Sequence, residues 1–137
     1  MQLAWLVCLD ATKEGDVTRS GILWSYDAIS STVSTVAIAG GLLYAADFDG
    51  DLHCLDAETG HCHWVHRAGG PIWGSPLVAD GKVYLGSGAR AFWVLKADKD
   101  LEVINRIRMR DGVFTTPVAA NGVLYVTTDK HLYAVGK

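Results

Sequence analysis

Long apolar runs, clusters of basic residues and a paired set of cysteines are all missing from this 137-residue sequence. No run approaches the roughly 20 apolar residues that a membrane-spanning helix needs, so we expect no membrane insertion. The 12 lysines and arginines form no cluster and face 15 acidic residues, which argues against nucleic acid or anionic lipid as a partner. The chain has three cysteines, Cys8, Cys54 and Cys62. An odd number cannot all be paired in disulfides within the chain, so we expect buried free thiols.

The N-terminal stretch MQLAWLVCLD lacks the features of a signal peptide. No basic residue precedes its apolar run, which is only about seven residues long, and bulky Val7 stands before Cys8 where a cleavage site needs a small side chain. We therefore expect no signal peptide in this chain. The length and a hydrophobic content of 50% predict one globular domain with its own core.

An internal repeat of about 40 residues organises the sequence. The residues that align between units are three glycines, Gly41, Gly81 and Gly122, and three tyrosines, Tyr44, Tyr84 and Tyr125. Each unit contains alternating apolar segments separated by turns such as AGG, ADG and ANG, and no segment has a helical period. The pattern predicts an all-β fold in which each unit is a β-propeller blade of four antiparallel strands.

The phase of the repeat predicts where the units are cut. LAWLVCLD matches DLHCLD of the next unit, and Trp24 stands 40 residues before Trp64, so the chain begins halfway through a unit. We predict a half blade over residues 1–32, full blades over 33–72 and 73–113, and a three-stranded blade over 114–137. Together these make a partial propeller of about three and a half blades, below the four to eight of typical closed rings.

The segment Asp47 to Glu58, DFDGDLHCLDAE, has acidic residues at its first, third, fifth and twelfth positions, as a calcium-binding EF-hand loop does. The sixth position, where such a loop needs glycine, is Leu52, and the glycine stands two places earlier at Gly50. The neighbouring units keep the apolar strands but have GSGAR and TTDK in place of the carboxylates. We therefore predict a β-hairpin here, with Asp and Gly acting as turn formers.

The stretch CLDAETGHCHW resembles the docking motif of pyrroloquinoline-quinone-like (PQQ-like) propeller repeats. The motif combines a small residue, an Asp, a Thr-Gly turn and a Trp, which are here Cys54, Asp56, Thr59, Gly60 and Trp64. The resemblance covers nearly the whole chain and implies that the tryptophan packs on the neighbouring blade over its Thr-Gly turn. Trp24 takes the same place in the first unit.

Two units depart from this pattern. The first has the longer ATKEGDVTRSG in place of the Thr-Gly turn, and the third has Lys96 and Ile104 where Asp and Trp are expected. We expect these departures to weaken docking locally without changing the fold, because the alternating apolar strands are present in every unit.

The resemblance implies two classes of function. Quinoprotein dehydrogenases of the family bind the quinone and Ca²⁺ on the axis of an eight-bladed ring, with a catalytic Asp and often a disulfide between adjacent cysteines. This chain has no adjacent cysteines, too few blades to enclose a cofactor, and no acid that matches the catalytic position. We therefore predict no catalytic, cofactor-binding or metal-binding residue, and a non-catalytic scaffold that binds protein partners. The alternative is part of a quinoprotein alcohol or sugar dehydrogenase, and the family implies an exported or periplasmic parent protein.

Two clusters of side chains are candidates for other chemistry. In HCHWVH, strand alternation places His61 and His63 on one face, where they could bind Zn²⁺ or Cu²⁺, but a third ligand is missing. An aromatic group could line an apolar ligand pocket, although packing between blades explains it better. Its members are Trp73, Phe92, Trp93 and Phe114.

Open blade edges at the two ends of the chain predict self-association. Residues 3–10 and 130–136 would carry unpaired backbone groups, which invite β-pairing with another chain. We therefore expect a homodimer or a larger ring, with a further protein as a possible partner.

Overall fold

The computed structural model describes residues 3–136, in which there are thirteen β-strands and no helix. Met1, Gln2 and Lys137 lie outside the described residues, so the predicted units 1–32 and 114–137 are described without these ends. Within the described range no helix is long and apolar enough to cross a membrane. The strands are β1 (Leu3–Leu9), β2 (Ile22–Ser30), β3 (Ala37–Ala39), β4 (Leu42–Ala46), β5 (Asp51–Asp56), β6 (Cys62–Arg67), β7 (Leu77–Ala79), β8 (Lys82–Ser87), β9 (Ala91–Lys96), β10 (Val103–Arg108), β11 (Val118–Ala120), β12 (Val123–Thr127) and β13 (Leu132–Val135).

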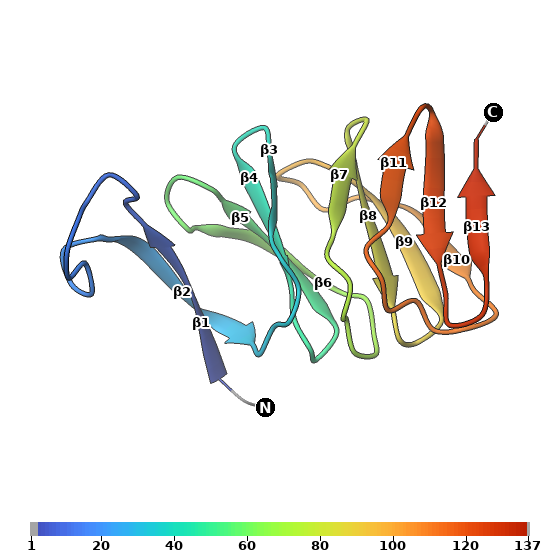
Figure 1. The fold of residues 1–137 in the computed structure, drawn as a ribbon, viewed down its shortest axis with the longest axis horizontal. Helices are drawn as coiled ribbons and strands as arrows, with labels where there is room; N and C mark the ends of the chain where they lie inside the picture. The colour runs from blue at the N-terminus through green and yellow to red at the C-terminus, as the bar shows by residue number, and fades with distance from the viewer. Residues whose placement is uncertain (1–2, 137) are drawn as a thin grey trace.

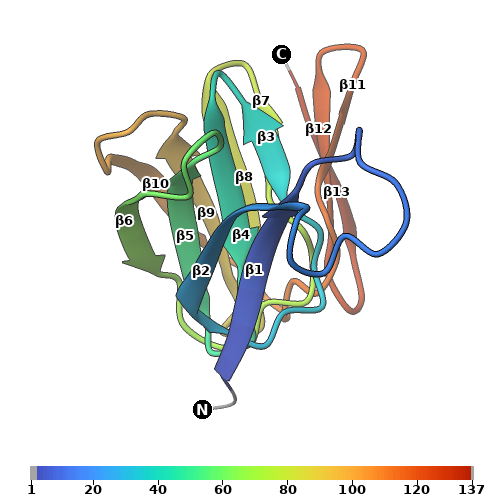
Figure 2. The same cartoon turned by 90° about the vertical axis from the view of Figure 1, so that its left-hand side faces the viewer.

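The strands form four antiparallel sheets in chain order. The first sheet pairs β1 with β2, the second runs β3-β4-β5-β6, the third runs β7-β8-β9-β10, and the fourth runs β11-β12-β13. Figure 1 shows these sheets following one another along the length of the molecule, with the first sheet at one end and the fourth sheet at the other. Figure 2 shows that the sheets stack face to face. The all-β fold with four-stranded antiparallel sheets, predicted from the repeat, is confirmed.

Three tight turns of one type begin the second, third and fourth sheets. Each joins the first two strands of its sheet through two consecutive residues with positive φ, the geometry of a type I′ hairpin turn. The residue pairs are Gly40-Gly41, Asp80-Gly81 and Asn121-Gly122. Glycine, aspartate and asparagine tolerate this left-handed conformation, which explains why AGG, ADG and ANG recur at these places.

The hydrophobic core lies between the sheets. Leu43, Ala45 and Leu55 of the second sheet pack against Leu6 and Trp24 of the first. The interface between the second and third sheets is the most deeply buried, with Tyr44, Leu52 and Leu85 at 0% exposure. A further cluster, which includes Phe92 and Val126, joins the third and fourth sheets. The inner strands of the second and third sheets turn alternate side chains toward the two neighbouring sheets, whereas all six residues of β10 are exposed.

Candidate functional site

The docking turn of the second sheet connects β5 to β6 and is built around Asp56. Its Oδ1 accepts hydrogen bonds from the backbone N–H groups of Glu58 and Thr59, both at 2.9 Å. The Thr59 hydroxyl oxygen accepts from the N–H of His61 at 3.2 Å. The backbone donors of Thr59 and Glu58 favour the ionised carboxylate and hold the pKa of Asp56 below its ordinary value. Asp56 and Thr59 therefore shape the turn themselves.

Trp24 of the first sheet lies over this turn. Its indole Nε1 donates to the backbone oxygen of Ala57 at 3.2 Å. Gly60 lies directly beneath the ring, because a Cβ at this position would come within 2.5 Å of Cε3 of Trp24. Gly60 also has a φ of +75°, a conformation that favours glycine. The Thr-Gly turn thus provides a flat surface for the tryptophan of the preceding sheet.

Trp64 makes the equivalent contact one unit later. Its Nε1 donates to the backbone oxygen of Asp98 at 3.0 Å, in the turn between β9 and β10. The side chain packs beside Tyr44 and Cys54, and the residue is only 8% exposed. Burial raises the pKa of the Cys54 thiol to about 12, so this thiol is un-ionised at neutral pH. The third sheet has Lys96 in place of the turn Asp, where its Nζ pairs with Asp98 at 3.2 Å.

Replacing Gly60 with alanine should destabilise the protein more than the same change at Gly41. Gly41 has a similar φ of +77°, but a Cβ there would meet no atom within 4 Å. The difference between the two variants isolates the contact with Trp24, and overpacking of this kind costs about 1–3 kcal/mol. Urea unfolding measures both values. Equal losses in the two variants would mean that Trp24 does not rest on Gly60.

A buried hydrogen-bonded chain connects the first and second sheets. Asp47 and His53 are each 2% exposed, and His53 Nε2 lies 2.9 Å from Asp47 Oδ2. His53 Nδ1 lies 3.0 Å from the hydroxyl oxygen of Tyr26 on β2. Asp47 also accepts from the backbone N–H groups of Ser30 at 3.2 Å and Asp51 at 3.0 Å. Because an ionised carboxylate only accepts, a neutral His53 donates from Nε2 to Asp47 and accepts a hydrogen bond from the Tyr26 hydroxyl at Nδ1.

Two of the four carboxylates that suggested a calcium loop, those of Asp47 and Asp51, are thus occupied within the fold. Asp47 points to His53, and Asp51 pairs with Arg67 at 3.0 Å. The segment forms the β4–β5 hairpin, as the repeat predicted, with its turn between Ala46 and Asp51. The role of Asp47 was not predicted from the sequence, because Tyr26 and Ser30 come from another repeat unit and leave no local signal.

The histidine pair forms no recognisable metal centre. The rings of His61 and His63 lie 5.4 Å apart between centroids and at 85° to each other. Among residues 3–136, no group of three histidine, cysteine or acidic side chains is placed to hold a metal ion.

The four aromatic residues proposed as a ligand pocket do not converge. Trp73 packs edge-on against Phe48, with ring centroids 4.8 Å apart, and Trp93 Nε1 donates to the backbone oxygen of Ala68 at 3.1 Å. Phe114 lies against Gly88 and Gly112. Phe92 lies between the third and fourth sheets and is the one member of the four that lines a cavity.

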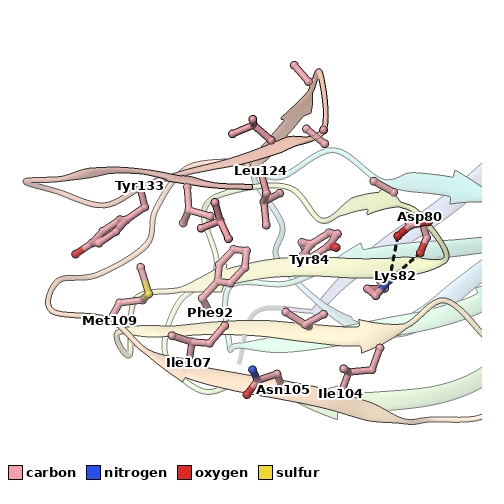
Figure 3. Close-up of a pocket in the computed structure, with 18 of the residues that line it drawn as sticks. Asp80, Lys82, Tyr84, Phe92, Ile104, Asn105, Ile107, Met109, Leu124 and Tyr133 are labelled. Carbon is pink, nitrogen blue, oxygen red and sulfur yellow. Dashed lines mark hydrogen bonds and ion pairs between the residues drawn. The ribbon is translucent and has the colours of Figure 1, made fainter. Parts of the chain in front are cut away.

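A large apolar groove lies between the third and fourth sheets. Its volume is about 960 Å³, and Figure 3 shows Phe92, Ile107 and Leu124 among the side chains that border it. Met109 and Tyr133 lie toward one end (Figure 3). The basic residues on its border are Lys82, Arg108 and Arg110. Lys82 pairs with Asp80 at 3.2 Å, whereas Arg108 and Arg110 form no ion pair with a described residue.

The groove coincides with a break in the docking pattern. In the preceding interface Trp64, which pairs with Cys54, fills the corresponding position. Here the strand register places Asn105 there, opposite Val94, so the sequence-based assignment of Ile104 to the tryptophan position was wrong by one residue. The neighbouring Ile104 is 46% exposed. The described part of the fourth sheet has three strands and ends on β13, so no fourth strand covers this side. The groove therefore lies beside an open strand edge.

Four stacked antiparallel sheets with tryptophan docking between units define a partial β-propeller. A family model described as "Outer membrane protein assembly factor BamB" matches residues 5–104. The chain belongs to this family of PQQ-like propeller repeats, as the docking motif indicated.

Curated relatives include quinone-dependent dehydrogenases. The dehydrogenase subunit of the alcohol dehydrogenase (quinone) of Gluconobacter oxydans (strain 621H) is 32% identical, over 56% of this chain and 13% of the relative. The quinohemoprotein alcohol dehydrogenase ADH IIB of Pseudomonas putida is 33% identical, over 58% of this chain and 14% of the relative. The chain thus corresponds to a small part of these enzymes.

Solved structures show the same fold. BamB from Moraxella catarrhalis superposes with a TM-score of 0.71 and 20% identity, covering 85% of this chain and 37% of that one. The quinohemoprotein alcohol dehydrogenase ADHIIG from Pseudomonas putida HK5 gives a TM-score of 0.63 at 20% identity, covering 81% of this chain and 24% of that one. At this identity the likeness concerns the fold, which both classes share, and the incomplete propeller is confirmed.

Proposed function

We propose that this chain is a non-catalytic propeller scaffold that binds a protein partner as an added β-strand. The observation that carries the proposal is the apolar groove beside the open edge of β13. An open edge offers backbone N–H and C=O groups to an incoming strand, and the groove accepts its alternate side chains. A partner of this kind would be an extended segment whose groove-facing side chains are apolar. An acidic residue in it would meet Arg108 and Arg110.

The chain itself supplies a suitable probe. Residues 57–67, AETGHCHWVHR, follow β5 as a docking turn and an outer strand that carries Trp64. Since β13 takes the place of β5 in the fourth sheet, a synthetic peptide of this sequence, with serine in place of Cys62, should pair with β13. We expect its tryptophan fluorescence to change on titration with the protein.

The matched variants are Ile104→Asp and Val103→Asp. Both residues are exposed apolar positions of β10, at 46% and 42%, but only Ile104 borders the groove. Burying an apolar side chain contributes about 1.5–3 kcal/mol, so Ile104→Asp should weaken peptide binding by about tenfold or more. Val103→Asp should bind the peptide as the parent does. No binding of the peptide, or equal weakening by both variants, would contradict strand addition at the groove.

The alternative function, part of a quinoprotein dehydrogenase, rests on the curated relatives. It is tested by adding pyrroloquinoline quinone and Ca²⁺ to the purified chain and measuring dye-linked alcohol oxidation. We expect none, and quinone-dependent turnover would overturn the scaffold proposal.

A further inference from the structure

Each internal sheet has a backward face, toward the preceding sheet, and a forward face, toward the following one. On β4, Leu43 and Ala45 pack backward against the first sheet, while Tyr44 packs forward against the third. On β8, Val83 packs backward and Tyr84 packs forward against the fourth sheet. The same two apolar surfaces therefore recur, and within the chain they always contact each other.

Among residues 3–136, the two end sheets each present one of these surfaces that no other sheet covers. The forward face of the fourth sheet exposes Val118 at 54%, Tyr125 at 36% and Leu132 at 67%. Val118 and Tyr125 are cross-strand partners, and so share a face. In the repeat, Tyr125 is equivalent to Tyr44, which is 0% exposed under the third sheet. The exposure of Tyr125 follows from the lack of a sheet beyond it among the described residues.

The backward face of the first sheet is the complementary surface. Along β1, Trp5, Val7 and Leu9 alternate with side chains that pack on the second sheet, and their exposures are 71%, 39% and 52%. Leu9 is equivalent in the repeat to Leu55, which is 0% exposed beneath the first sheet. At Leu9 this face thus has the same residue that the second sheet uses to receive a forward face.

We propose that a second copy of this chain stacks its backward face, Trp5, Val7 and Leu9, on the forward face of the first copy, Val118, Tyr125 and Leu132. The contact continues the stacking that joins successive sheets within the chain, so each surface meets the type of surface it already binds. It is head-to-tail, because the two faces differ. Two copies of four sheets each make eight sheets, which is within the range of closed propellers. The association is independent of the groove and of strand addition at β13.

The test is the mass in solution of the purified full chain, measured by light scattering after size-exclusion chromatography over a wide concentration range. The expected mass is twice the 14.7 kDa of one chain. Val7→Asp places a charge in the backward face and Leu132→Asp places one in the forward face, so each variant alone should be monomeric. Val65→Asp is the matched control, because Val65 is 44% exposed but lies on the second sheet.

Mixing the two monomeric variants tests whether the copies associate head-to-tail, with a backward face on a forward face. The Val7→Asp chain keeps a forward face and the Leu132→Asp chain keeps a backward face, so an equimolar mixture should recover a two-chain species. This recovery also shows that both variants are folded. A monomeric parent, a mixture that stays monomeric, or single variants that remain dimeric would each overturn face-to-face stacking.

A groove variant separates this inference from the proposed function. Ile104→Asp should keep the parent's mass while it weakens peptide binding, and Val7→Asp, which lies on β1 and not on β13, should bind the peptide normally. A loss of association in Ile104→Asp would mean that the groove, and not the end faces, joins the copies.

Discussion

Trp64→Ala should lower the free energy of unfolding by about 3–5 kcal/mol, the loss expected for a buried tryptophan. The side chain is 8% exposed and packs in the cluster between the second and third sheets. Its removal also leaves the backbone oxygen of Asp98 without the indole donor. Because small domains are stable by only about 5–15 kcal/mol, the variant should unfold at much lower urea or fail to accumulate in soluble form.

Trp73→Ala is the matched control for this change. Trp73 is 49% exposed and lies against Phe48 at the edge of the fold, so its truncation should cost much less. Chemical unfolding followed by far-UV circular dichroism compares the three proteins without depending on tryptophan fluorescence. An unfolding midpoint of Trp64→Ala equal to that of the parent would refute the buried anchoring role.

Asp47→Ala should have the second large effect, a loss of about 3 kcal/mol, since each buried donor left unpaired costs about 1–3 kcal/mol. The carboxylate accepts from His53 and from the backbone N–H groups of Ser30 and Asp51. Removal of the Asp47 carboxylate leaves these three donors buried without their acceptor. Urea unfolding at neutral pH measures the loss, and an unchanged midpoint would contradict a structural role for Asp47.

The same carboxylate should make stability depend on acid pH. Burial pushes the pKa of Asp47 upward, but the donors from Asp51, His53 and Ser30 outweigh it, and the net pKa lies below the ordinary value. The stabilising contribution is therefore complete above the unfolded pKa of about 3.9 and is lost as pH falls through the lower folded pKa. Asp47→Asn should be less stable at neutral pH and should lose less stability on acidification than the parent. Parallel pH profiles for the two proteins would exclude Asp47 as the group that titrates.

Local features of the sequence were sufficient to predict the fold. Tyr44, Tyr84 and Tyr125 mark second strands, and the glycines before them occupy left-handed turn positions that few other residues adopt. The docking turn could also be predicted from the sequence, since Asp56 and Gly60, which shape it, lie only four residues apart. These signals depend on short-range geometry, which a repeat displays several times.

The functional features depend on contacts that the sequence does not display. Tyr26 reaches His53 across 27 residues, and no local pattern marks either residue as a member of a hydrogen-bonded chain. The groove arises because Asn105 occupies the position that Trp64 has in the preceding unit and because the described fourth sheet ends at β13, so its walls come from two units. The absence of the tryptophan was visible in the sequence, but the strand register that places Asn105 there, and the space that is left, were not.

Because the three core clusters each join only two successive sheets, the molecule is a linear array in which cooperativity passes from neighbour to neighbour. The two middle sheets are covered on both faces, whereas each end sheet is anchored on one. Local opening should therefore begin at the ends, and amide hydrogens of β1 and β13 should exchange with solvent before those of β5 and β8. Any partner that covers an end sheet would slow this exchange and stabilise the whole array, even without touching its centre.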